Sequence, residues 1–128
     1  MRVLLDTHAF LWFITDDRRL SSRPREIMED PENDLLLSIA SLWEIAIKTS
    51  LGKLTLARPF DELMPHELAG NAIEILPIRL DHLTTLTSLP FHHRDPFDRL
   101  IVAQAVVEEM PVLSGDSAFS SYPARLLW

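Results

Sequence analysis

Short apolar runs alternate with stretches of helical pattern along this chain. The runs typical of buried strands are 2–5, 35–39, 72–77, 112–114 and 126–128. The helical patterns between them cover 7–15, 22–29, 41–51, 59–69, 81–89 and 96–110. Strands separated by helices are joined by crossover connections, which make the sheet parallel and cover both of its faces. The sequence therefore predicts an α/β fold with a mainly parallel central sheet.

Length and composition indicate one ordinary globular unit, and we expect a single domain over residues 1–128. Apolar residues make up 47% of the chain and charged residues 24%, which argues against disorder. The absence of cysteine excludes disulfides, thiolate metal sites and a cysteine nucleophile. No apolar stretch reaches the roughly 20 residues that cross a bilayer, and the first residues do not resemble a signal peptide. We therefore expect a soluble, cytoplasmic protein without a membrane partner.

The formal net charge of −7 is unlike that of most nucleic-acid-binding domains, which carry a basic patch. An enzyme that holds metal ions with carboxylates is also acidic in sequence, because the neutralising ions are not part of the chain. Net charge alone therefore does not decide whether the partner is a nucleic acid.

Four acidic residues lie next to apolar segments or where a segment turns. Asp6 ends the first apolar run, Glu44 lies within the apolar helix pattern 41–51, Asp98 opens the helix pattern 96–110, and Asp116 follows the run 112–114. A carboxylate beside buried apolar neighbours is costly unless a positive group compensates it. In parallel sheets, ligands bind beyond the carboxyl ends of the strands, where Asp6 and Asp116 are expected.

Each acid also has a structural explanation. Asp6 is a favourable N-cap for the following helix, and Asp116 is a common turn residue. Glu44 is spaced to pair with Lys48 at i,i+4. Asp95 and Asp98 fit the N-cap and third positions of a helix that begins at a proline.

Four clustered carboxylates cannot all stay ionised without cations nearby. Oxygen ligands alone favour Mg²⁺, with Mn²⁺ as the second possibility. The chemistry that follows is metal-assisted hydrolysis of a phosphodiester bond, in which an ion activates the attacking water and polarises the phosphoryl group.

Four sequence segments resemble the PIN-domain ribonucleases, and most closely the VapC-type toxins of bacterial toxin–antitoxin pairs. The segments are Leu-Leu-Asp-Thr-His at 4–8, Ser-Leu-Trp-Glu-Ile-Ala-Ile-Lys at 41–48, His-Arg-Asp-Pro-Phe-Asp-Arg-Leu at 93–100 and Leu-Ser-Gly-Asp at 113–116. They occur in the family's order and at familiar spacing over the whole chain. The resemblance implies a three-layer α/β/α sandwich.

The resemblance implies that the catalytic acids are Asp6, Glu44, Asp98 and Asp116, with metal held by Asp6, Asp98 and Asp116. Asp95 is the rival of Asp98 for the third acid. The supporting residues that the resemblance indicates, with this rival, are Thr7, Asp95 and Ser114. A further acid that some family members carry beyond the fourth is replaced here by Ser117 and Ala118.

Other side chains have two interpretations each. The cations Lys48, Arg94 and Arg99 either contact RNA phosphate or are structural partners of the acids. The adjacent His92 and His93 are either metal ligands or polar loop residues. The aromatic residues Phe10, Trp12 and Phe13 could form a base-stacking platform. The alternative is that they belong to the core or to a subunit interface.

The leading hypothesis is an Mg²⁺-dependent endoribonuclease that acts as a toxin. By resemblance, its partners are an RNA substrate, a cognate antitoxin and a second copy of the chain, with 7–15 and 36–51 as candidate contact surfaces. One alternative is a catalytically silent PIN-like scaffold that binds a partner. Another is a phosphoacceptor signalling domain, although the lysine that such a domain needs after a late strand is absent beyond Lys53.

Overall fold

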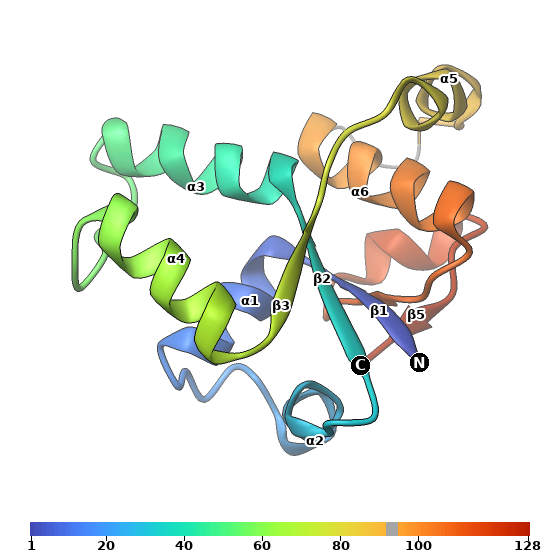
Figure 1. Cartoon of the computed structure of the whole chain (residues 1–128). Helices are drawn as coiled ribbons and strands as arrows, with labels where there is room; N and C mark the ends of the chain where they lie inside the picture. Colours follow the sequence, from blue (N-terminus) through green and yellow to red (C-terminus); the bar gives the residue numbers. More distant parts are fainter. Residues whose placement is uncertain (92–94) are drawn as a thin grey trace.

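A computed structural model of the chain, which describes residues 1–91 and 95–128, contains a five-stranded sheet whose paired strands are all parallel (Figure 1). The strands are β1 (Arg2–Leu5), β2 (Asp34–Ser38), β3 (Ile73–Leu76), β4 (Val112–Leu113) and β5 (Leu126–Leu127). Their order in the sheet is β3-β2-β1-β4-β5, so β1 is central and pairs with β2 and β4. The predicted parallel α/β fold is confirmed.

Alternate residues of the strands supply two separate cores, one on each face of the sheet. Val3 and Leu5 of β1 belong to one core, and Leu4 belongs to the other. This alternation is what strands covered on both faces require. The three-layer sandwich implied by the resemblance is therefore confirmed.

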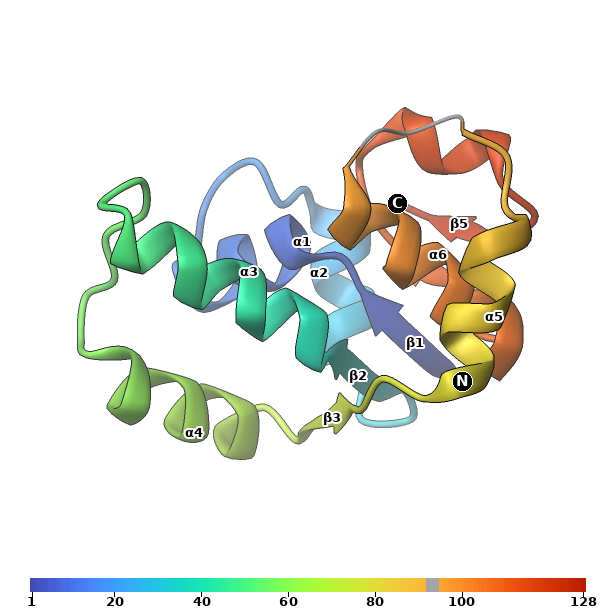
Figure 2. The same cartoon turned by 90° about the horizontal axis from the view of Figure 1, so that it is seen from above.

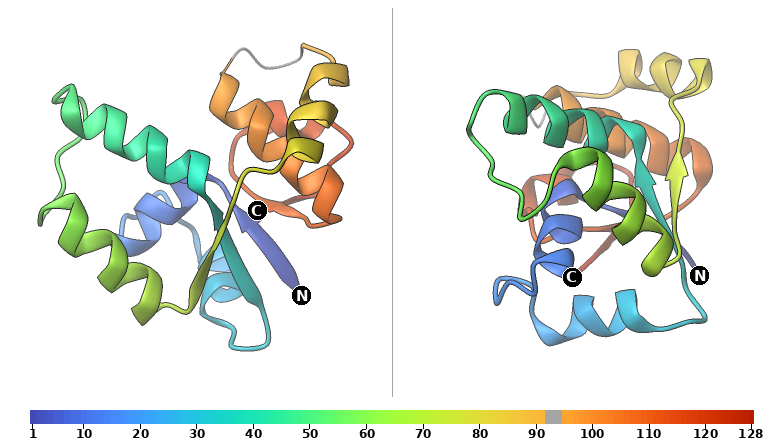
Figure 3. Two further views of the ribbon diagram at one scale, coloured as in Figure 1. Left: turned by 45° about the horizontal axis from the view of Figure 1, so that its top comes forward. Right: turned by 60° about the vertical axis from the view of Figure 1, so that its left-hand side comes forward.

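The helices divide between the two faces. The first core is covered by α1 (Thr7–Ile14), α2 (Ser22–Glu29), part of α3 (Ile39–Ser50) and α4 (Phe60–Gly70). The second core is covered by α5 (Leu80–Ser88), α6 (Pro96–Glu108) and a short 3-10 helix, η1 (Ser117–Ser121). The left view of Figure 3 shows the blue and green helices on one side of the strands and the yellow, orange and red elements on the other.

Two of the local differences from the sequence-based expectation bear on the site, while most other element ends shift by one or two residues. Helix α3 begins at Ile39 rather than Ser41, because the Ser38 hydroxyl caps it by accepting a hydrogen bond from the backbone N–H of Ala40 at 3.1 Å. The 3-10 helix η1 was not predicted. Asp116 caps η1 by accepting from the backbone N–H of Ala118 at 3.0 Å.

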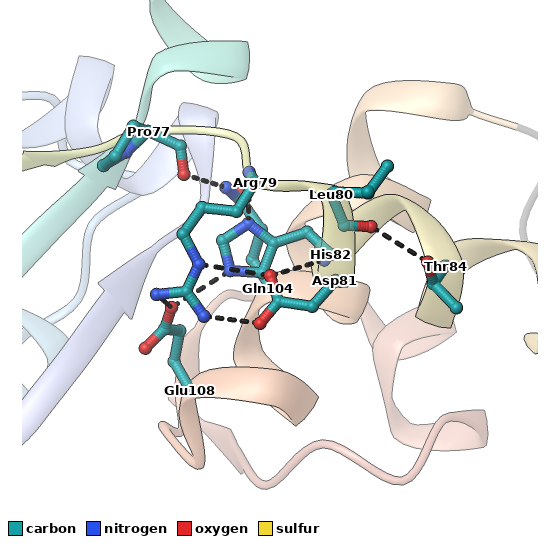
Figure 4. A network of polar contacts seen from close by, with 8 residues as sticks. All are labelled: Pro77, Arg79, Leu80, Asp81, His82, Thr84, Gln104 and Glu108. Carbon is teal, nitrogen blue, oxygen red and sulfur yellow. Dashed lines mark hydrogen bonds and ion pairs between the residues drawn. The ribbon is translucent and has the colours of Figure 1, made fainter.

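A polar network joins α5 to α6, which lie side by side (Figures 2 and 4). The fully buried His82 ring accepts a hydrogen bond from the backbone N–H of Arg79 at 3.0 Å, and its Nε2 lies 3.0 Å from Glu108 Oε1. The Arg79 guanidinium pairs with both Asp81 and Glu108. The network fixes α5 on α6, whose first turn carries Asp98.

None of the helices in the described ranges combines the length and apolar character that crossing a membrane demands.

Candidate functional site

The pairing of β1 with β4 brings Asp6 next to Ser114. Leu5 is in register with Leu113, so the residues that follow them leave the sheet at the same edge. The backbone N–H of Asp6 donates to the carbonyl of Leu113 at 3.0 Å. The predicted site residues at the ends of these two strands are therefore neighbours in space.

Hydrogen bonds connect Asp6, Ser114 and Asp116. The Ser114 hydroxyl donates to Asp6 Oδ2, and the same oxygen of Ser114 accepts from the backbone N–H of Asp116 at 3.0 Å. Asp6 also caps α1, since its Oδ1 accepts from the backbone N–H of His8 at 2.6 Å. The expected capping role of Asp6 is therefore real, and it occupies only one of the two carboxylate oxygens.

The carboxyl of Asp6 is almost completely buried, with 4% of the residue exposed. Burial raises the pKa of Asp6, and this effect exceeds the lowering by the hydrogen bonds from Ser114 and His8. The nearby charge of Asp116 raises the pKa further. The site thus holds a carboxyl whose ionised form is disfavoured until a cation arrives.

Glu44 and Lys48 form the i,i+4 pair expected from their spacing, with Lys48 Nζ 2.7 Å from Glu44 Oε2. The other oxygen, Glu44 Oε1, is buried and has no hydrogen-bond partner among the described residues. The hydrogen bond to Glu44 raises the pKa of Lys48, and the charges of Glu44, Asp95 and Asp98 add to this effect. Asp95 and Asp98 on α6 therefore lie within electrostatic reach of α3.

One hydrogen bond ties the helix that carries Glu44 to the β1–β4 edge. The Thr7 hydroxyl donates to Ser41 Oγ at 2.8 Å, and both residues are buried. Ser41 lies one turn before Glu44 on the same face of α3, because helical residues three apart are neighbours. Thr7, predicted as a supporting residue, therefore joins the start of α1 directly to the helix that carries Glu44.

Asp95 and Asp98 occupy the positions that the capping pattern predicts. Asp95 is the N-cap of α6 and accepts hydrogen bonds from the backbone N–H groups of Phe97 and Asp98, at 2.9 and 3.4 Å. Asp98 lies one turn further in and is half-buried. Capping therefore accounts for Asp95 and leaves Asp98 as the stronger candidate for the third acid.

The donors at the site are carboxylate oxygens, the ligand type that a hard divalent cation prefers. In the described ranges, no group of three or more Asp, Glu or His side chains lies close enough to enclose a metal ion. The site offers instead the raised-pKa carboxyl of Asp6 and the unpartnered buried oxygen of Glu44. Mg²⁺ is usually held by one or two carboxylates together with water and substrate phosphate, so an open arrangement of this kind suits it.

The proposed RNA-binding cations have different surroundings. Arg99 is buried, and its guanidinium donates to the carbonyls of Leu86 and Leu89 at 3.4 and 3.0 Å and lies over the Phe91 ring. These contacts favour the structural interpretation of Arg99 over the RNA-binding one. Lys48 pairs with Glu44 but keeps a half-exposed side chain. The predictions for His92, His93 and Arg94 concern residues outside the described ranges.

A cleft of about 290 Å³ opens beside the acids. Its lining consists of Asp6, His8, Trp12, Arg19, Gly115 and Asp116. His8 and Arg19 were not singled out from the sequence. His8 and Trp12 lie in the first and second turns of the helix that Asp6 caps, so their spacing from Asp6 in the sequence could have indicated that they are near the site. Arg19 follows the helix, and no sequence pattern indicates its place. Phe10, by contrast, lies in the core.

The sequence matches a known protein family. Residues 3–124 match the family described as PIN domain. Ribonuclease VapC16 of Mycobacterium tuberculosis (strain ATCC 25618 / H37Rv) is 39% identical over 61 residues, which are 48% of this chain and 42% of that protein.

Solved structures share the fold at low sequence identity. VapBC2 from Rickettsia felis, bound to a DNA fragment from its promoter, has a TM-score of 0.74 at 15% identity, covering 99% of this chain and 98% of that one. VapBC-1 from nontypeable Haemophilus influenzae has a TM-score of 0.65 at 12% identity, covering 99% and 97%. Since the family match extends over nearly the whole sequence, the chain belongs to the PIN-domain family.

Proposed function

We propose that this protein is a metal-dependent endoribonuclease that hydrolyses RNA phosphodiester bonds at the site formed by Asp6, Glu44, Asp98 and Asp116. The observation that carries the proposal is the buried Asp6 carboxyl, with its raised pKa, beside Asp116 at the carboxyl edge of the sheet. The partial similarity to a protein named as a ribonuclease also supports the proposal.

Asp6, Asp98 and Asp116 do not form a closed ligand group in the described structure. They would therefore hold Mg²⁺, or Mn²⁺, together with water and the substrate phosphate, and the ion would supply an activated water and charge stabilisation at the phosphate. Ser114 keeps one oxygen of Asp6 oriented through its hydroxyl, while the N–H of His8 holds the other. The unpartnered oxygen of Glu44 is suited to accept a hydrogen bond from the attacking water. Lys48 pairs with the other oxygen of Glu44 and balances the negative charge of this carboxylate.

The test is RNA cleavage by the purified protein, free of any partner, with Mg²⁺ or Mn²⁺ added. Asp6→Asn and Asp98→Asn are each expected to reduce cleavage by a factor on the order of 10² or more, because each removes a charge that would face the metal. Asp34→Asn is the matched control, since Asp34 is an exposed residue at the N-terminal end of β2, away from the carboxyl edge of the sheet. Cleavage that persists in both site variants, or in excess chelator, would sink the metal mechanism.

The biological setting that we propose is a toxin–antitoxin pair, in which a cognate antitoxin binds this chain and blocks the site. The similarity to solved VapBC toxin–antitoxin complexes supports a partner of this kind. Co-expression with the antitoxin should suppress RNA cleavage and allow the two proteins to be purified together. A cytoplasmic location and a single domain over 1–128 stay predictions.

We also propose that the protein forms a homodimer. The exposed apolar side chains of α3 support the predicted contact surface at residues 36–51. Trp43 is 59% exposed and Ile39 is 39% exposed, which is unusual for side chains of this size. Light scattering of the wild-type protein and of Ile39→Ser would test the surface. A monomeric mass for the wild-type protein would remove the proposal.

The silent-scaffold alternative predicts partner binding without metal-dependent cleavage, so the cleavage assay separates it from the nuclease. Membership of the PIN-domain family argues against the phosphoacceptor alternative.

A further inference from the structure

Three side chains from α1 and the segment after it separate two neighbouring cavities. His8, Trp12 and Arg19 line both the cleft of about 290 Å³ that contains Asp6 and Asp116 and a larger cavity of about 500 Å³. We refer to these three residues as the shared wall. Because both cavities are lined by the same side chains, they adjoin each other at the acidic site.

The shared wall is an aromatic surface with a cation on it. His8 and Trp12 are four residues apart on α1, with ring centroids 5.9 Å apart and planes inclined by 42°. The guanidinium carbon of Arg19 lies 5.0 Å from the centre of the Trp12 ring. His8 Nδ1 lies 3.8 Å from Asp6 Oδ1, and the Arg19 guanidinium pairs with Asp17 at 2.7 Å. Their side chains are nevertheless 59% and 68% exposed, so this surface is open to a ligand.

The larger cavity combines apolar walls with positive charge. Its apolar lining includes Leu11, Leu54 and Leu56, and its basic lining includes Lys48 and Lys53 in addition to Arg19. Lys53 is exposed and forms no ion pair within the part of the chain that the structure describes. Arg19 pairs with Asp17, which also lines this cavity, and Lys48 pairs with Glu44, so Lys53 carries the least compensated positive charge beside the acidic site.

We propose that the shared wall binds a nucleobase of single-stranded RNA next to the phosphate that is cleaved, with the following phosphate directed toward Lys53. This inference rests on the proposed ribonuclease function and names how the substrate is held. Bases that are not paired stack on aromatic side chains and on arginine planes, and such stacking does not depend on the base sequence. The adjoining cations then meet the backbone phosphates, whose charge the acidic site would otherwise repel.

The geometry favours a single strand over a duplex. A base can lie flat against His8 and Trp12 only if it has left its helical stack, because paired bases expose their edges and not their faces. The shared wall lines the same cleft as Asp6 and Asp116, so a base resting on it would remain attached to a phosphate at the acids.

The test measures RNA binding in a protein that cannot cleave. The background is Asp98→Asn with Mg²⁺, and the probe is a fluorescein-labelled single-stranded RNA hexamer followed by fluorescence anisotropy. His8→Ala and Arg19→Ala are expected to weaken binding about tenfold each. Arg18→Ala is the matched control, because Arg18 is an exposed arginine next to Arg19 that lines neither cavity. Its effect should be no more than about twofold.

A second probe separates base stacking from general charge attraction. A hexamer of the same length without bases should bind more weakly to the parent, and His8→Ala should weaken it no further. The proposal is overturned if His8→Ala and Arg19→Ala bind the normal hexamer like Arg18→Ala, or if His8→Ala weakens both hexamers equally. It is also overturned if these variants lose only the antitoxin in a pull-down, since the wall would then be a protein-binding surface.

The two proposals fail in different ways. A wild-type protein that cleaves RNA, combined with His8→Ala and Arg19→Ala variants that bind normally, would overturn the stacking inference alone. A protein that binds RNA in a base-dependent way but never cleaves it would overturn the nuclease proposal alone.

Discussion

The hydroxyl of Ser114 donates a hydrogen bond to the buried carboxylate of Asp6, although the two residues are 108 positions apart in the chain. The same Ser114 oxygen accepts from the N–H of Asp116. One hydroxyl therefore orients two of the proposed site acids, and it does so because β1 and β4 are neighbours in the sheet.

Ser114→Ala should shift the acid limb of the cleavage pH profile to higher pH. The Ser114 hydrogen bond lowers the pKa of Asp6, so its loss raises that pKa further, and ionised Asp6 is reached only at higher pH. Cleavage near neutral pH should fall by a factor on the order of 10, as expected for a hydrogen bond to a charged group. Ser120→Ala, which removes only the local bond to the carbonyl of Ser117, serves as the control. An unchanged pH profile would contradict the positioning role.

Asp6→Asn should make the metal-free protein more stable at neutral pH. Because burial raises the folded-state pKa of Asp6, the stability that its protonated form contributes is complete below about pH 3.8 and is lost as the pH rises through the raised value. Thermal unfolding in chelator should therefore show a higher Tm for the variant at pH 7, and the difference should shrink as the pH approaches 4.

Added Mg²⁺ should reverse this order. An ion that binds the folded wild-type protein stabilises it by mass action, whereas Asp6→Asn lacks the charge that attracts the ion. A variant that is less stable than the wild type in chelator at pH 7 would show that the capping hydrogen bond of Asp6 outweighs its burial.

Asp95→Ala and Asp98→Asn should separate stability from activity. Asp95 caps α6, so its replacement should lower the free energy of unfolding by about 1 kcal/mol and leave most of the cleavage intact. Asp98→Asn should keep the fold and lose the cleavage. Chemical denaturation and single-turnover cleavage of both variants measure the two effects. The opposite result would make Asp95 the third site acid.

Gly115→Ala should disturb the turn between Ser114 and Asp116. A Cβ at residue 115 would lie 2.7 Å from the Trp128 ring, so either the ring or the turn must shift. We expect reduced cleavage and altered tryptophan fluorescence. Gly70→Ala is the control, because a Cβ there meets nothing within 4 Å at the end of α4 and should be neutral or slightly stabilising. Equal effects of the two substitutions would show that the Trp128 contact is unimportant.

Arg99→Leu should destabilise the protein without weakening RNA binding. The buried guanidinium donates to two carbonyls at the end of α5, and hydrogen bonds of a charged donor contribute about 1.5–3 kcal/mol each. Chemical denaturation should report the loss, and anisotropy at a temperature where the variant is folded should report unchanged RNA affinity. Weaker RNA binding by a folded variant would restore the RNA-contact interpretation of Arg99.

Local patterns in the sequence were sufficient wherever the deciding interactions are short-range. The periodicity of the apolar residues predicted the parallel α/β arrangement, the spacing of Glu44 and Lys48 predicted their ion pair, and the Asp-Pro-Phe-Asp segment predicted the cap at Asp95. The apolar pattern predicts the start of α3 two residues late, because Ser38 and Ser41 are both favourable capping residues and only the end of β2 selects Ser38.

Contacts between distant segments were decided by the tertiary structure. The sequence indicated that Asp6 and Asp116 follow strands, but the strand order β3-β2-β1-β4-β5 is what brings Asp6 beside Ser114. The shared wall depends in the same way on Arg19 folding back over Trp12. Strand order and loop path are set by packing over long sequence separations, which no local spacing encodes. The sequence therefore determined which acids are candidates for the chemistry, and the fold determined that Asp6 lies beside Ser114 and Asp116.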